Sequence, residues 1–287
     1  MKRHFFIFAA SIIMLANINS KGQLPDFIDK KLLNDEDNNF LLINEYKQTW
    51  IDDELKFQDK NTYSYDLRGN NTEIVAQERI DNQWNNRIKI VYSYNAEDSL
   101  SEEIRKEWKR VEWDYQWINA IRSVYLRNNV GYVKEILVQT WQNDSWLDKF
   151  KSICTYDQRD NLVNALILRF YENKWINYIN YKCTYDVENR LTKMLEQFYL
   201  HTQKWLDYSQ DLFKYNENGN LFETVHQINN NNWLNDYKIN YYYNDENNIY
   251  ESEWWNWENN NWVDTLKTEY LYDMNENLID EIQQRRQ

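Results

Sequence analysis

A tryptophan followed by a tyrosine at a fixed separation recurs along this chain, and the repeated pair constrains the fold more than any other feature. The separation is ten residues in seven copies and eight in the third, and successive copies follow every 28 to 33 residues. A period of this length is typical of a chain built from one supersecondary unit used many times. The tryptophan position is filled by Leu55, Trp84, Trp117, Trp146, Trp175, Trp205, Trp233 and Trp262, and the tyrosine position by Tyr65, Tyr94, Tyr125, Tyr156, Tyr185, Tyr215, Tyr243 and Tyr272.

Both separations are even, and even offsets lie on one face of a β-strand. In a helix, exchanging ten residues for eight would move the tyrosine to a different side, so the exchange is harmless only in a strand. The intervening residues agree, because Ile88 and Ile90 alternate with Arg87 and Lys89. Each copy therefore predicts one amphipathic strand, with aromatic side chains on one face and lysines on the other.

A five-residue turn, such as residues 157–161, follows each tyrosine position, and a leucine then opens a second strand. The chain has one Pro and four Gly, so Asn and Asp must build these turns, which they do by bonding their own backbone. An antiparallel hairpin would place Tyr185 opposite Leu191 and Tyr181 opposite Leu195, so that apolar side chains meet across the ladder.

Eight hairpins of about 30 residues predict an all-β domain. A flat sheet would leave its aromatic face in water, although burying one large side chain stabilises a fold by about 1.5–3 kcal/mol. We therefore expect a curled or spiral antiparallel sheet, with the aromatic face inside and the lysines outside. A propeller-like arrangement, with two hairpins in each of four blades, is the alternative.

The first residues have the order of an export signal. Lys2 and Arg3 precede an apolar stretch at residues 5–15, and small residues follow at 20–22. The apolar stretch is too short to span a bilayer, and no later segment is apolar enough to do so. We expect a signal peptide at residues 1–22, a lead-in at 23–34 and a single β-hairpin repeat domain at 35–287, in a protein that is secreted, on the cell surface or in the periplasm.

The formal net charge of −13 limits the partners. Such a chain repels phosphates, so binding to nucleic acid or to anionic lipid is not expected. A glycan or a surface protein remains as a possible partner, and the sequence does not specify an oligomeric state.

Two turn segments carry a resemblance to a known family. Residues 63–70 read Tyr-Ser-Tyr-Asp-Leu-Arg-Gly-Asn and residues 213–221 read Phe-Lys-Tyr-Asn-Glu-Asn-Gly-Asn-Leu. This form resembles the YD repeats of RHS-type secreted and surface proteins. With the added Trp-x-Asn motif at 84–86 and 175–177, the chain is more similar to tandem-repeat proteins exported through type IX secretion. The resemblance covers roughly residues 35–284 and implies hairpins that wind into a spiral shell, without adding a catalytic residue.

The aromatic residues outside the repeated positions are the candidates for ligand contact. Trp254, Trp255 and Trp257 form the densest cluster, and strand alternation places Trp255 and Trp257 on one face and Trp254 on the other. An indole that faces solvent could stack on a sugar or a peptide. Filling of a wide core is the alternative for these residues and for the similar extra residues Trp108, Trp113 and Trp141.

Other candidate sites have stronger structural explanations. Cys154 and Cys183 occupy equivalent positions two strands apart, about 9.5 Å, which favours two buried thiols over a disulfide. The turn at 273–277 begins like a calcium loop but lacks its other ligands, so hairpin turns explain it better.

No zinc-ligand spacing, nucleophile elbow, phosphate loop or cofactor motif stands out. We expect a non-enzymatic repeat scaffold that gives a binding or adhesive surface. A carbohydrate-binding module that uses exposed aromatic residues is the first alternative. A glycan-active enzyme, with two carboxylates hidden among the many acids, is the second.

Overall fold

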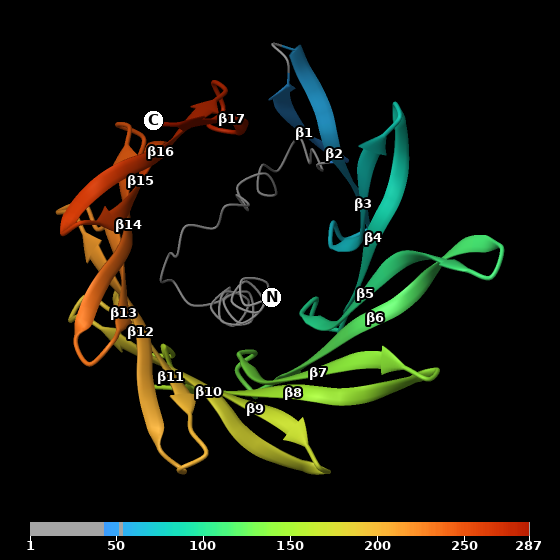
Figure 1. Ribbon diagram of the computed structural model, residues 1–287, viewed down its shortest axis with the longest axis horizontal. Helices are drawn as coiled ribbons and strands as arrows, with labels where there is room; N and C mark the ends of the chain where they lie inside the picture. Colours follow the sequence, from blue (N-terminus) through green and yellow to red (C-terminus); the bar gives the residue numbers. More distant parts are fainter. Residues whose placement is uncertain (1–42, 52–53, 287) are drawn as a thin grey trace. The chain divides into compact units, whose positions relative to one another are not determined.

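A computed structural model describes residues 43–51 and 54–286 (Figure 1). The predicted signal peptide and lead-in lie outside these residues. The described part contains 17 strands and no helix, which confirms the all-β prediction. The strands are β1 (Asn44–Ile51), β2 (Glu54–Tyr65), β3 (Asn71–Ile80), β4 (Gln83–Tyr94), β5 (Leu100–Val111), β6 (Asp114–Arg127), β7 (Val133–Gln142), β8 (Ser145–Tyr156), β9 (Leu162–Tyr171), β10 (Lys174–Tyr185), β11 (Leu191–Tyr199), β12 (Trp205–Tyr215), β13 (Leu221–Asn229), β14 (Trp233–Tyr243), β15 (Ile249–Glu258), β16 (Asn261–Tyr272) and β17 (Leu278–Arg285).

The described residues form two compact units. One contains residues 43–51, 54–153 and 168–176, and the other contains 154–167 and 177–286. In the first unit, consecutive strands pair antiparallel from β1–β2 to β7–β8. In the second unit they do so from β10–β11 to β16–β17. Propeller blades would break the ladder after every four strands. The propeller alternative is therefore wrong, whereas the curl of the whole sheet depends on how the units are placed and stays a prediction.

Two kinds of turn alternate along both ladders. The turn that follows each tyrosine position has five residues. Its first Asp or Asn accepts a hydrogen bond from the fifth backbone N–H group, and in most copies also from the third. Asp66 Oδ1, for example, lies 2.9 Å from the nitrogens of both Arg68 and Asn70. The other kind has two residues in most copies, and both have positive φ in the pairs Asp81–Asn82, Asn143–Asp144, Glu172–Asn173 and Asn259–Asn260. It has five residues between β11 and β12 and three between β13 and β14. Positive φ at both positions matches the right-handed twist of the strands, and Asn and Asp tolerate it.

A β-bulge follows the tryptophan position in every copy whose register is described there. On β3, Ala76 lies opposite Ile88 but Gln77 lies opposite Asn86, so Arg87 is an extra residue in β4. An extra residue reverses the face taken by everything beyond it. The extra residues stand three places after the tryptophan position, at Gln58, Arg87, Ala120, Lys149, Tyr208, Asp236 and Thr265.

The tryptophan and tyrosine positions consequently lie on opposite faces of the sheet. The prediction that they share one face is wrong, because the parity argument counts the bulge residue as an ordinary strand residue. We call the two surfaces the tyrosine face and the tryptophan face. The tyrosine face carries Ile88, Ile90 and Tyr92, and the tryptophan face carries Trp84 and Lys89.

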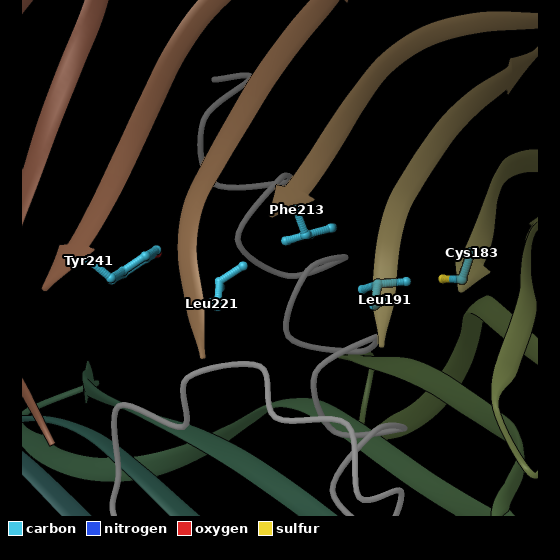
Figure 2. Packing of buried hydrophobic residues seen from close by; sticks show 5 residues of the cluster. All are labelled: Cys183, Leu191, Phe213, Leu221 and Tyr241. Atoms are coloured by element: carbon cyan, nitrogen blue, oxygen red, sulfur yellow. The ribbon is translucent and has the colours of Figure 1, made fainter. Parts of the chain in front are cut away.

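The hydrophobic core lies on the tyrosine face. In the second unit five of its side chains form a row from β10 to β14, each no more than 9% exposed (Figure 2). These residues are Cys183, Leu191, Phe213, Leu221 and Tyr241.

Tyrosine hydroxyls join each copy to the one before it. The hydroxyl donates to the backbone carbonyl oxygen of the residue that opens the preceding copy's second strand, at 2.7 Å from Tyr94 to Asn71 and 2.9 Å from Tyr215 to Leu191. In the third copy Arg127 Nη2 donates to the Leu100 oxygen instead, at 3.3 Å. Arg127, and not Tyr125, therefore fills the tyrosine position there, and the separation is ten residues in every copy.

A second bulge, just after the five-residue turn, changes the hairpin register. Tyr185 lies opposite Leu191, as predicted, but Thr192 is extra. The predicted pairing of Tyr181 with Leu195 is consequently wrong, because Tyr181 lies opposite Glu196. Thr192 Oγ1 donates to the Thr184 carbonyl oxygen at 3.1 Å, which compensates for the disturbed ladder.

The two cysteines are both buried and free, which confirms the prediction of thiols over a disulfide. Burial raises the pKa of the Cys183 thiol to about 12. A thiol of this kind packs as a small apolar side chain and is a poor nucleophile.

Candidate functional site

Half-buried tryptophans and charged side chains share the tryptophan face in both units. The indole of Trp117 packs on Trp108 with ring centroids 4.9 Å apart, and Trp146 packs on Trp141 at the same distance. In the second unit Trp262 packs on Trp257 at 4.8 Å. Such ring pairs are worth about 0.5–1.5 kcal/mol beyond the area that they bury.

Lysines on this face lie over the tryptophan rings. Lys89 Nζ is 5.3 Å from the Trp117 centroid and also 2.9 Å from Glu73 Oε2. Lys151 repeats the arrangement, at 5.1 Å from Trp175 and 3.1 Å from Glu135 Oε1. The tryptophan face therefore presents ring faces, ammonium groups and carboxylates together, copy after copy.

The predicted cluster Trp254, Trp255 and Trp257 is divided between the two faces. Trp255 and Trp257 share a face and Trp254 takes the other, as alternation predicted. Lys238 Nζ lies 5.1 Å from Trp255 and 5.3 Å from Trp262, so Trp255 and Trp257 belong to the tryptophan face. Trp254 stacks on Tyr237 at 4.4 Å on the tyrosine face.

The Trp-x-Asn/Asp motif has a structural role beside the first bulge. Its Asn or Asp accepts a hydrogen bond from a glutamine directly opposite on the preceding strand. Four copies show this bond, at 2.7–3.0 Å, and the pairs are Gln77–Asn86, Gln139–Asp148, Gln197–Asp207 and Gln227–Asn235. The motif thus stabilises the strand end at which the chain changes faces.

A polar cluster on the tyrosine face of the second unit is absent from the sequence-based predictions. Glu196 is 5% exposed and accepts hydrogen bonds from Tyr181 Oη at 2.8 Å and Ser209 Oγ at 2.7 Å. On the next strands Asp211 Oδ1 lies 2.8 Å from His226 Nδ1. The rings of His226, Tyr237 and Trp254 continue the cluster as a stack, with the first two 4.8 Å apart.

Burial and hydrogen bonding shift the titration of this cluster. Burial raises the pKa of Glu196 above its ordinary value, against the opposing effect of the Ser209 and Tyr181 hydrogen bonds. Burial alone would lower the pKa of His226, but the hydrogen bond to Asp211 and the negative charge of that carboxylate outweigh burial and raise the pKa. A buried carboxyl group with a raised pKa beside an Asp–His pair has the chemical character of a general acid or base.

Stability of the protein is expected to fall as the pH rises from about 4.5 through the raised pKa values of Glu196 and His226. Glu196 and His226 both bind protons more tightly in the folded chain, so their contribution is complete below the ordinary pKa values of 4.5 and 6.5. It is lost as the pH rises through their raised folded-state pKa values, by about 1.4 kcal/mol for each tenfold difference in proton affinity between the folded and unfolded chain. Urea unfolding at a series of pH values measures this fall.

The variant Glu196→Gln should show a smaller fall, because the side chain has no proton to lose. Its amide oxygen accepts from one of the two hydroxyls, Tyr181 or Ser209, and its NH2 group donates to the other. Glu217→Gln, at an exposed turn position, is the control and should follow the wild-type profile. A Glu196→Gln profile as steep as the wild type would contradict the assignment.

The predicted turn chemistry at Asp273 is also visible. Hydrogen bonds from the side chain and backbone of Asn277, and from the backbone of Asn275, lower the pKa of Asp273. The carboxylate oxygens are thus engaged in shaping the turn, as the hairpin-turn interpretation predicted. Among residues 43–51 and 54–286, no group of three or more His, Cys, Asp or Glu side chains is placed to hold a metal ion.

Comparisons with known proteins identify no family for this chain. No family model and no curated protein matches this sequence. Similar solved structures include a protein of unknown function from Bacteroides fragilis, 16% identical with a TM-score of 0.34, over 40% of this chain and 88% of that one. TcdB2-TccC3 is 14% identical with a TM-score of 0.34, over 79% of this chain and 14% of that one. A porin-like protein from Bacteroides uniformis is 10% identical with a TM-score of 0.35, over 73% of this chain and 92% of that one.

Likenesses at these values say nothing about activity or partners. Within the part of the chain that the structure describes, no helix has the length and apolar character needed to cross a membrane.

Proposed function

We propose that this chain is an exported, non-enzymatic repeat scaffold whose tryptophan face binds a ligand. The observation that carries the proposal is the composition of that face. Half-buried indoles recur there with lysines and carboxylates beside them, whereas the side chains of the core lie on the opposite face. Aromatic rings beside mixed charges suit recognition of a glycan or of a protein surface.

Export and family membership are part of the same proposal. The charged, apolar and small residues at 1–22 support export. The Tyr-x-Tyr-Asp turns and the Trp-x-Asn/Asp motif support kinship with YD-repeat proteins of bacteria that use type IX secretion. Both motifs have structural roles here, so membership of that family would account for the repeated hairpins. The ligand would then be bound by side chains outside the two motifs.

A carbohydrate-binding module is the more specific form of the proposal. Trp255, Trp257 and Trp262 lie together on the tryptophan face, with Lys238 over two of the rings. We expect Trp257→Ala to weaken binding to immobilised glycans about tenfold, because it removes one ring of the Trp257–Trp262 pair. Binding to a glycan array, with circular dichroism to verify folding, measures the effect.

Trp254→Ala is the matched control, since Trp254 lies on the same strand but on the opposite face. It should leave glycan binding unchanged. Equal loss of binding in both variants would show that the tryptophan face is not the ligand surface.

A glycan-active enzyme is the second candidate, and the raised pKa of Glu196 favours it. In this case Glu196 would act as the acid and the Asp211–His226 pair would lie beside it. Release of reducing sugar by the wild type, abolished in Glu196→Gln, would support the enzyme and contradict the non-enzymatic proposal.

A further inference from the structure

The β5–β6 hairpin is longer than its neighbours. In β3–β4 and β7–β8 a single residue pair, Ile80–Gln83 or Gln142–Ser145, separates the tryptophan position from the turn. In β5–β6 the pairs Lys109–Gln116, Arg110–Tyr115 and Val111–Asp114 all lie beyond Trp108–Trp117. We call residues 110–115 the arm. Both neighbouring hairpins form the same bulge without it, and β7–β8 also forms the same ring pair, so the fold does not require the arm.

The arm exposes aromatic side chains. Trp113 is 90% exposed at the turn, where four other copies have only Asn, Asp or Glu, and Tyr115 is 53% exposed. Tyr115 stacks on Trp108 with a centroid distance of 6.2 Å and an interplanar angle of 17°, and Trp108 in turn contacts Trp117. Tyr115, Trp108 and Trp117 therefore form one continuous strip along the tryptophan face of the hairpin, with Trp113 at its end.

We propose that the arm, together with Trp108 and Trp117, binds the rings of a neutral oligosaccharide. The proposal rests on the proposed function and assigns its ligand class. The C–H face of a pyranose ring is apolar and flat enough to stack on an indole or a phenol. Its hydroxyl groups point outward from the ring edge and can bond to polar side chains beside the strip.

The charges on the arm favour a neutral, hydroxyl-rich ligand. Arg110, Glu112 and Asp114 are exposed, and Lys109 Nζ is 2.7 Å from Glu107 Oε2. Both signs are interspersed, so the arm offers hydrogen-bond donors and acceptors but no basic patch for a polyanion. Glu112 and Asp114 flank Trp113, and carrying these carboxylates into the hydrocarbon core of a bilayer would be costly.

Binding to cellohexaose, maltohexaose and chitohexaose tests the proposal by calorimetric titration of the full chain. We expect at least one hexasaccharide to bind the wild type. Trp113→Ala and Tyr115→Ala should each raise the Kd about tenfold, and replacement of residues 110–115 by Asn-Asp, the turn of β7–β8, should abolish binding. Tyr171→Ala is the matched control, because Tyr171 is also 53% exposed beside a two-residue turn, and it should leave the Kd unchanged.

Two results of the sugar titrations, and one with vesicles, would overturn the assignment. One is failure of all three hexasaccharides to bind the wild type. The other is equal affinity in the wild type and the variant without the arm. Arm-dependent binding to phosphatidylcholine vesicles in place of the sugars would likewise overturn it and indicate a lipid-interface anchor.

The same titrations separate this inference from the proposed function. Binding that is lost in Trp257→Ala but retained without the arm would leave the tryptophan face as the ligand surface and refute the arm. Binding that requires the arm but is unchanged in Trp255→Ala and Trp257→Ala would support the arm and confine the ligand to it.

Discussion

Deleting Asp236 is expected to lower the free energy of unfolding by at least about 3 kcal/mol, although the Asp236 side chain is exposed. Asp236 is the extra residue of the bulge in β14. Without it, Trp233 and Asn235 would move to the tyrosine face, or the residues from Tyr237 onward would move to the tryptophan face. The first change removes the 2.8 Å bond from Gln227 to Asn235, and either change misplaces at least one large ring, worth about 1.5–3 kcal/mol.

Urea unfolding of the deletion variant measures this loss, and Asp236→Ala serves as the control for the side chain alone. The substitution keeps the bulge and should change stability by no more than about 0.5 kcal/mol. A deletion variant as stable as Asp236→Ala would mean that the bulge does not determine which residues face the core.

Replacing Phe213 by alanine is expected to cost about 3–5 kcal/mol, as for other buried phenylalanines. Phe213 is 9% exposed in the row of core residues on the tyrosine face. Trp205 stands on the same strand but on the tryptophan face, where it is half-buried against Tyr199 at 5.0 Å. Although Trp205 is the larger residue, Trp205→Ala should cost only about 1–2 kcal/mol, because much of its surface already meets water.

Chemical denaturation of both variants under the same conditions tests the order of the two losses. The order matters more than either value, since it reports which face holds the core. A larger loss for Trp205→Ala would reverse the assignment of the two faces.

The periodic sequence was sufficient to predict the strands, the hairpins and the turns. The repeated aromatic pair and the Asn- and Asp-rich turns are local signals, and the structure confirms what they imply. The faces could not be predicted by counting, because the bulge residues Arg87, Lys149 and Asp236 share no residue type. The sequence nevertheless contains one signal. Strict alternation would put Asn86 and Asp148 on the apolar face, and a polar residue that recurs at this position in several copies indicates that the chain changes faces beside it.

The candidate sites also differ in whether local sequence signals could predict them. Trp255 and Trp257 share a face because no bulge intervenes between them, so alternation predicted their arrangement correctly. Glu196, Asp211 and His226 come from three strands, and their alignment depends on the bulges at Thr192 and Tyr208. No spacing in the sequence marks that cluster. The arm did leave a signal, since the spacing from Trp84 to Trp117 is 33 residues where most copies have 28 to 30.

The first bulge recurs once per copy in every copy whose register is described, and this limits how the length of the sequence can change in evolution. Gain or loss of a whole copy adds or removes two strands, about 9.6 Å of ladder, while every remaining side chain keeps its side of the sheet. Loss of one residue at a bulge, by contrast, exchanges the two sides locally. Duplication in units of a full copy is therefore the route by which the molecule can lengthen without altering what either side displays.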